Sequence, residues 1–217
     1  MRNTLILAAL LAAAPFAASA ADGLSYTYVE GGYSHLKLHS SELDDPSVDG
    51  AYVRGSYAVS TQLYVFGGYT RMSRTDRVDL GGTPADRLSL KTTLSQPELG
   101  IGYFQQMTDK IDFVADLGWQ RLEAKLKAKA YGESATDKDH VNLGRLNLGI
   151  RGKPSEHTEG WLKVGYIDGE HADDIFDSKF VGTAGLQVSF NRTWGIVGEV
   201  QAYDGATQAS LGVRASF

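Results

Sequence analysis

Residues 111–119 have the sequence IDFVADLGW, in which apolar side chains recur at every second position. Successive side chains of a β-strand point to opposite faces. One face of this stretch would carry the carboxylates of Asp112 and Asp116, together with Val114 and Gly118. The other face would be apolar throughout, consisting of Ile111, Phe113, Ala115, Leu117 and Trp119. The stretch therefore predicts a strand with one apolar wall and one charged wall.

The same alternation recurs along the chain after Asp22, and almost no helical period of 3.6 residues accompanies it. The clearest further examples are AYVRGSYAV at 51–59 and TWGIVGEVQAY at 193–203. Polar segments separate the alternating stretches. The expected strands are 24–38, 49–60, 62–72, 88–105, 111–127, 141–152, 160–172, 178–191, 193–203 and 206–217.

The connections between these strands alternate in length. Those after the first, third, fifth and seventh strands are long, at 39–48, 73–87, 128–140 and 173–177. Short turns at one end and long loops at the other are typical of outer-membrane barrels, which have an even number of strands. A sheet in lipid must also close, because lipid offers no hydrogen bonds to an open edge. The sequence predicts an all-β fold, a ten-stranded antiparallel transmembrane β-barrel, with eight strands as the alternative count.

The first twenty residues, MRNTLILAALLAAAPFAASA, resemble a secretory signal peptide. Arg2 precedes an apolar run, and Ala18-Ser19-Ala20 forms a small-residue cleavage site. We expect a signal peptide at 1–20 and a single barrel at 21–217. The chain has no cysteine, which excludes disulfides and thiolate metal sites. Its formal charge of −5 is opposite to that of a nucleic-acid-binding surface.

The faces opposite the apolar stripes carry charges of both signs, which we expect to line the interior as one network. Barrels of about 8–10 strands have narrow interiors that side chains largely fill. We therefore predict a structural or surface-interaction protein with no enzymatic activity and no cofactor, and a small-solute pore as the alternative. The predicted lumen network is Glu30, Arg54, Glu98, Asp112, Asp116, Arg145, Lys163, Glu199 and Arg214.

Three tryptophans are candidates for the aromatic girdles that flank the apolar band of a membrane barrel. Trp161 and Trp194 each open an expected strand after a short turn, which places both at one rim. Trp119 lies eight residues beyond Ile111. That separation is on the order of 20 Å along the membrane normal, so we expect Trp119 at the opposite rim.

The last ten residues, QASLGVRASF, end on an aromatic side chain. They resemble the C-terminal assembly signal of bacterial outer-membrane barrels: a polar residue, a glycine, an apolar residue and a terminal aromatic. The matching residues are Ser210, Gly212, Ala215 and Phe217. The resemblance implies that the last strand pairs with the first.

Two stretches depart from the regular alternation. In 88–103, leucines occupy even positions up to Leu94 and then odd positions from Leu99. Either a β-bulge near Pro97 reverses the faces, or 88–95 rises above the membrane. In LEAKLKAKA, 122–130, the parity shifts in the same way. We expect an extension of the preceding strand there, and a short basic helix is the alternative.

Some loops combine histidine with carboxylates, the groups that general-base catalysis uses. His39 lies near Asp44, Asp45 and Asp49, and His171 lies near Asp173 and Asp174. Solvated loop tips have the same composition, and no nucleophile motif accompanies them. The acidic segment 168–177, DGEHADDIFD, is an alternative candidate for a Ca²⁺ site, although it lacks EF-hand spacing.

Three stretches resemble a family of small outer-membrane barrels of Gram-negative bacteria, labelled sulfation-dependent quorum factor or diffusible-signal-factor-regulated outer-membrane protein. They are 21–33, 52–70 and 190–200. The resemblance implies an outer-membrane location, sometimes in released vesicles. It also implies a secreted N-terminal peptide sulfated on a tyrosine, which by position is Tyr26.

The expected partners follow from a place in the outer membrane. They are outer-membrane lipid and lipopolysaccharide, the barrel-assembly machinery and periplasmic chaperones. We expect no nucleic acid and a monomeric state.

Overall fold

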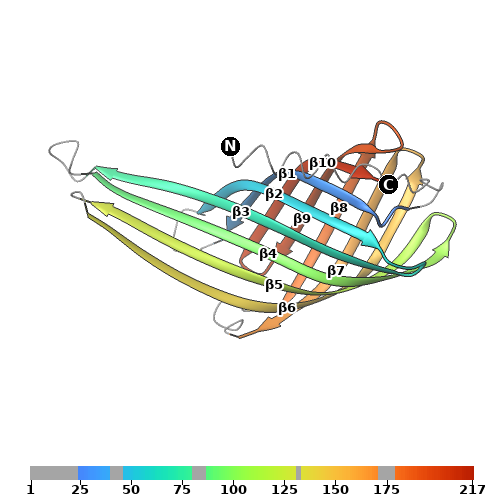
Figure 1. Ribbon diagram of the computed structural model, residues 1–217, viewed down its shortest axis with the longest axis horizontal. Coiled ribbons are helices and arrows are strands. Elements are labelled where there is room, and N and C mark those ends of the chain that lie inside the picture. The colour runs from blue at the N-terminus through green and yellow to red at the C-terminus, as the bar shows by residue number, and fades with distance from the viewer. Residues whose placement is uncertain (1–23, 40–45, 80–86, 131–132, 171–178) are drawn as a thin grey trace.

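The computed structural model describes residues 24–39, 46–79, 87–130, 133–170 and 179–217. Ten antiparallel strands form a closed barrel in which each strand pairs with its neighbours in sequence and β1 pairs with β10 (Figure 1). No helix among these residues is long and apolar enough to span a membrane. The strands are β1 (Tyr28–Leu38), β2 (Ser47–Ala58), β3 (Leu63–Asp79), β4 (Arg87–Thr108), β5 (Ile111–Ala130), β6 (Glu133–Ser155), β7 (Thr158–Gly169), β8 (Phe180–Ser189), β9 (Trp194–Tyr203) and β10 (Ala206–Ser216). The predicted fold class and the count of ten are confirmed.

Strand alternation separates an apolar outer wall from a mixed interior. On β5, Leu117 is 57% exposed on the outside, whereas Asp116 is 4% exposed on the inside. A wall of exposed leucine, isoleucine, valine and aromatic side chains is unfavourable in water and suited to lipid. The other outward residues of this wall include Leu99, Ile101, Leu148, Leu162, Val164, Leu186, Ile196 and Leu211.

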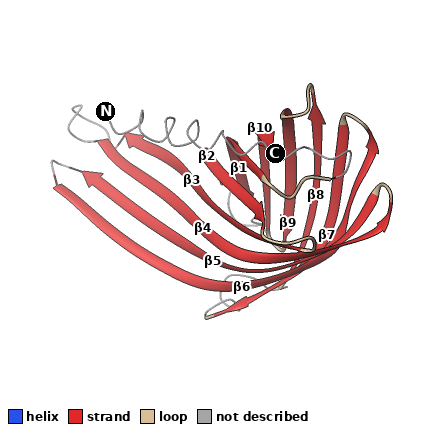
Figure 2. Ribbon diagram, turned by 45° about the vertical axis from the view of Figure 1, so that its right-hand side comes forward, coloured by secondary structure: helices blue, strands red, loops and turns tan. Residues whose placement is uncertain are grey.

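Four neighbouring strands, β3 to β6, are much longer than the other six. They contain 17, 22, 20 and 23 residues, against 10 to 12 in the others. Figures 1 and 2 show them projecting beyond the rest of the barrel at one end. We call this projecting sheet the outer extension; it comprises 71–79, 87–95, 121–130 and 133–142. The short turns lie at the opposite end.

The outer extension corrects two loop predictions. Most of the expected loops 73–87 and 128–140 is paired strand, since Asp79 pairs with Arg87 and Ala130 with Glu133. The segment 122–130 is strand, as expected, and not helix. Outside the membrane both faces of a sheet meet water, so a polar sequence no longer distinguishes strand from loop.

The predicted bulge near Pro97 is wrong. Register is the same on both sides of this proline, because Ser95 pairs with Glu123 and Glu98 with Gln120. The irregularity in this hairpin lies between Gln106 and Thr108. Leu94 therefore faces inward like Glu98, and it packs on a buried apolar cluster. The change in sequence pattern reflects a change in interior chemistry with depth, not a reversal of faces.

The interior has apolar layers at both ends. At the extension end, one cluster contains Leu36, Val48, Met72 and Ala206, and a second contains Leu143, Ile167 and Val181; Tyr203 packs against both. At the turn end, Tyr26, Tyr64 and Val114 form the turn-end cluster with Phe66 and Phe104. The Tyr26 and Phe104 rings stack with their centroids 3.8 Å apart. Charged side chains occupy the space between these layers.

Candidate functional site

The charged layer is centred on Glu30, which the register places between two arginines. Glu30 of β1 pairs with Arg214 on β10 and with Arg54 on β2. Its Oε2 lies 2.5 Å from the Arg214 Nη2, and its Oε1 lies 3.2 Å from the Arg54 Nε. Glu30 is 2% exposed. A buried carboxylate needs such partners, because an unpaired charge in a nonpolar interior is costly.

The network continues from Arg54 across the lumen to β9. The Arg54 Nη1 lies 2.6 Å from Oε1 of Glu199, and the Arg54 Nη2 donates to the Ser210 hydroxyl at 3.0 Å. The Trp161 indole N–H donates to the other Glu199 oxygen at 2.8 Å. Five strands thus contribute to one connected arrangement of charges.

The placement of Trp161 corrects the predicted girdle. This side chain is buried inside the barrel, where the Arg214 guanidinium also lies over its ring at 5.1 Å. Trp161 shares its face of β7 with Lys163, so the period-2 pattern alone would have placed it inside. Trp119 and Trp194 are about half exposed on the outer wall.

A second group of charges lies on the opposite wall, formed by β3 and β5 to β7. Asp116 accepts hydrogen bonds from the Tyr64 hydroxyl and from the Lys163 ammonium, the latter at 2.5 Å. Asp112 accepts a hydrogen bond from the Tyr26 hydroxyl at 2.8 Å. The tyrosines of the turn-end cluster therefore connect that apolar layer to the charged layer.

One buried ion pair was missed by the sequence prediction. Nη2 of Arg151 lies 2.6 Å from Oε2 of Glu159, and both side chains are more than 90% buried. The alternation of the sequence contained this information. Arg151 falls on the same strand face as Arg145, and Glu159 falls on the same strand face as Lys163. Glu159 lay just before the expected strand 160–172, whereas Arg151 lay within the expected strand 141–152 but was not included in the predicted network.

Arg145 and Glu98 differ from the other charges of the layer. The Arg145 guanidinium donates to Asn147, Gln201 and Thr183, at 2.8, 3.0 and 3.1 Å. Among the residues that the structure describes, no carboxylate lies within ion-pair distance of it. Glu98 lies beside Arg54 and contributes to its electrostatic surroundings. Neutral amides and a hydroxyl thus hold Arg145.

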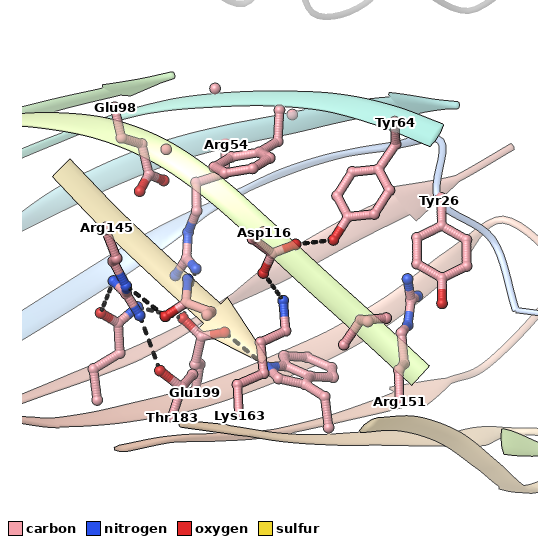
Figure 3. A pocket seen from close by; sticks show the side chains of 18 of the residues that line it. Tyr26, Arg54, Tyr64, Glu98, Asp116, Arg145, Arg151, Lys163, Thr183 and Glu199 are labelled. Carbon is pink, nitrogen blue, oxygen red and sulfur yellow. Dashed lines mark hydrogen bonds and ion pairs between the residues drawn. The ribbon is translucent and has the colours of Figure 1, made fainter. Parts of the chain in front are cut away.

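A cavity of about 120 Å³ remains among these side chains. Figure 3 shows Glu98, Arg145, Asp116 and Lys163 around it, with Tyr64 and Tyr26 at one end. Its walls carry both signs of charge, and the groups that project into it are held by the contacts above. This volume is enough for a few water molecules.

The predicted assembly residues lie along the seam that closes the barrel. The Phe217 amide donates to the Thr27 carbonyl, and the Ser25 hydroxyl donates to the Phe217 carbonyl. A Cβ on Gly212 would lie 2.5 Å from the Gly31 carbonyl oxygen, so the seam requires glycine there. Ser210 faces inward onto Arg54, and Ala215 is buried.

The histidine–carboxylate candidates are only partly within the described chain. His39 contacts the Thr207 hydroxyl, so the candidate pairing of His39 with Asp49 is not formed. The partner of Asp49 is His35, whose Nδ1 lies 2.6 Å from the carboxylate. Hydrogen bonds from His35 and Tyr33 hold the pKa of Asp49 below its usual value. The remaining candidates, Asp44, Asp45, His171, Asp173 and Asp174, lie outside the described residues, as do the signal peptide and most of the acidic segment 168–177.

Comparison with known proteins shows the fold. No family model and no curated protein sequence matches the chain. Among solved structures, the translocator domain of the autotransporter NalP from Neisseria meningitidis has a TM-score of 0.54 and 12% identity, covering 100% of this chain and 98% of that one. Ail from Yersinia pestis has a TM-score of 0.48 and 13% identity, covering 88% and 97% of the two chains. The outer-membrane protease OmpT from Escherichia coli has a TM-score of 0.49 and 9% identity, covering 89% and 95%. The fold is that of a bacterial outer-membrane barrel.

Proposed function

We propose that the chain is an integral protein of the bacterial outer membrane, present as a monomer and also carried on released vesicles. Its role is structural or in surface interaction. The outer wall of apolar side chains fits a bilayer, and the long strands fit the extracellular side because periplasmic turns are short. Membrane insertion implies the barrel-assembly machinery and periplasmic chaperones as partners, and lipid and lipopolysaccharide as surroundings.

One observation favours a structural or surface-interaction role over the conduction of ions or small solutes. Apolar layers lie at both ends of the lumen, and charged side chains that bind one another lie between them. A conducting channel needs a continuous aqueous path, which barrels of this size lack when side chains fill them. The small-solute pore is the second candidate, favoured by the cavity beside Arg145.

Conductance in planar lipid bilayers separates the two candidates. We expect the purified wild-type chain to show no stable conductance steps. A Tyr26→Ala, Tyr203→Ala variant removes a ring from each closing layer and should conduct more than wild type. Tyr57→Ala and Tyr69→Ala, on the outer wall, serve as matched controls. Steady ion-selective steps from the wild-type protein would contradict the structural role and favour the pore.

The location is tested separately by cell fractionation. We expect the full-length chain in the outer-membrane fraction, with a gel mobility that changes on boiling, as closed barrels retain their fold in detergent. A soluble species without this change would contradict the membrane location.

We also propose that the folded barrel, not a released peptide, is the functional form. The resemblance to the quorum-factor family would make Tyr26 a sulfation site. In the barrel, the Tyr26 hydroxyl is buried and donates to Asp112, and its ring stacks on Phe104. A sulfate on this oxygen would place a second anion against the carboxylate. Mass spectrometry should find Tyr26 unmodified in the membrane protein and no N-terminal fragment in culture fluid.

We propose no enzymatic role. The His39 side chain binds Thr207, and the His35–Asp49 pair lies on the outer surface. A hydrolytic activity of the purified protein that disappears in His171→Ala or His35→Ala would contradict this proposal.

A further inference from the structure

The outward face of the outer extension carries a cluster of positive charge. Odd-numbered residues of β3, β4 and β5 face outward in the barrel wall, as Tyr69, Leu99 and Trp119 show, and the register continues unbroken into the extension. On β6 the outward residues are even-numbered, as with Leu146 and Leu148. We define the outer basic patch as Arg71, Lys91, Arg121, Lys125, Lys127 and Lys138, all on this face.

The strand register brings like charges directly together within the outer basic patch. Lys91 on β4 pairs with Lys127 on β5, and Lys125 on β5 pairs with Lys138 on β6. Like charges directly opposite one another destabilise a sheet. Among the described side chains, none of these four lysines has a carboxylate within ion-pair distance. An anion bound between them would remove the repulsion that the sequence otherwise leaves in place.

Hydroxyl groups accompany the cations on the same face. Ser73, Thr93, Lys125 and Lys138 form one row across four strands, and Arg71 and Ser95 lie one row closer to the membrane. Of the three hydroxyl residues, Thr93 is buried, so Ser73 and Ser95 are the ones that can reach a ligand. Glu123 lies in that lower row and is bound by Arg121, with Oε1 3.2 Å from the guanidinium Nε. Guanidinium, ammonium and hydroxyl donors together suit phosphate oxygens.

The depth of the outer basic patch indicates what it meets. Arg71 lies two residues beyond Tyr69, and Arg121 lies two residues beyond Trp119, on the same outward face. Two residues of a tilted strand advance about 5 Å along the membrane normal. Aromatic rings sit at headgroup level, so these arginines lie at the level of the lipid headgroups. Lys125 is about 15 Å beyond Trp119 by the same measure.

We infer that the outer basic patch binds the phosphate groups of lipopolysaccharide, the phosphorylated glycolipid of the outer leaflet. Arg71 and Arg121 lie at the level of the phosphates on its lipid portion, and the four lysines lie at the level of the sugars and phosphates above it. This inference rests on the proposed outer-membrane location with the extension outside. Cations near an anionic lipid surface each contribute to binding, and salt screens that contribution.

The test measures binding of defined lipids to the full chain in detergent micelles. The probe is bisphosphorylated lipid A, compared with the same lipid A after removal of both phosphates, by titration calorimetry at two salt concentrations. The variants are Arg71→Gln with Arg121→Gln, and Lys125→Gln with Lys127→Gln. The matched control, Lys110→Gln with Arg192→Gln, removes two exposed cations at the turn end. Gel mobility before and after boiling verifies that each variant is folded.

We expect wild type and the control to bind bisphosphorylated lipid A equally, at least tenfold more tightly than the dephosphorylated lipid, and less tightly at high salt. Each patch variant should bind at least tenfold more weakly. Inorganic pyrophosphate should compete only at much higher concentration. Equal binding of both lipids, or unchanged affinity in folded patch variants, would overturn the inference. Tight binding of pyrophosphate or of a sulfated oligosaccharide in place of lipid A would also overturn it.

The two proposals fail in different ways. If the chain is found in the outer membrane but binds lipid A equally well with and without its phosphates, only this inference is overturned. A chain absent from the outer membrane in the fractionation experiment would overturn both.

Discussion

At the scale of single residues, the interior depends on reciprocal pairing. The Glu30 carboxylate contacts two arginines that lie on neighbouring strands on either side, and Arg54 extends the contact to Glu199. The alternation of the sequence predicted that these side chains face inward. It did not predict which ones meet, because partners are set by register between strands far apart in the chain.

Replacing Glu30 tests this dependence. Glu30→Gln leaves the buried Arg214 guanidinium and the partly buried Arg54 guanidinium facing a neutral amide. Removing one partner of a buried pair typically costs about 3–5 kcal/mol of unfolding free energy. Asp76→Asn is the matched control, because Asp76 also contacts an arginine but is about half exposed. We expect less than about 1 kcal/mol there. Urea unfolding in lipid vesicles measures both, and equal effects would contradict the pairing.

Tryptophan fluorescence tests the corrected position of Trp161. Brominated lipids quench rings that face the acyl chains, so Trp119→Phe and Trp194→Phe should each reduce the quenchable fraction of the emission. Trp161→Phe should leave the quenched signal unchanged, because this ring lies inside the barrel beside Glu199. If Trp161→Phe reduces the lipid-quenched fraction, the Trp161 ring faces lipid at the rim of the barrel and not the interior.

At the scale of elements, sequence patterns predicted strands where a membrane imposes them. Between the girdles, one face must be apolar, and β5 shows this from Ile111 to Trp119. Beyond Trp119 the outward positions of the same strand become Arg121, Glu123 and Lys125. There the constraint disappears, so the boundaries of β3, β5 and β6 could not be read from the pattern, and Pro97 was assigned a bulge it does not have.

The same strand offers a direct test of depth. Leu117→Arg places a charge on the lipid-facing wall and should cost about 2–4 kcal/mol if it lies near the midplane. Glu123→Arg lies on the same face of β5, about six residues further along the strand. It should cost less than about 1 kcal/mol, because only an exposed ion pair is lost. Folding equilibria in vesicles measure both substitutions. If Leu117→Arg leaves the free energy of unfolding unchanged, the faces assigned to β5 are the wrong way round.

At the scale of the whole molecule, closure depends on the seam between β1 and β10. Eleven residue pairs join these strands, from Tyr28 with Ser216 to Leu38 with Ala206. The sequence predicted this pairing through the resemblance of the last strand to an assembly signal. It did not indicate that the segment before β1 turns inward, so that Tyr26, expected within the first strand, instead fills the turn end.

Substitution at the seam tests assembly. Phe217→Ala should lower the amount of heat-modifiable barrel in the outer membrane, because Phe217 lies where the two ends of the sheet meet. Phe190→Ala, an exposed ring in the turn between β8 and β9, is the matched control and should assemble normally. Equal assembly of both variants would contradict the role of the seam residue.

The unequal strand lengths have a consequence for self-association. The barrel proper has no free edge, but the outer extension has two: in the described chain, 74–79 of β3 and 133–142 of β6 each pair on one side only. Unpaired strand edges outside the membrane are templates for sheet-to-sheet fusion between molecules. Charges of both signs lie along them, including Arg74 and Asp76 on one edge and Asp137, Lys138 and Asp139 on the other. Charged edge strands resist such fusion, so neighbouring molecules at high density would remain separate.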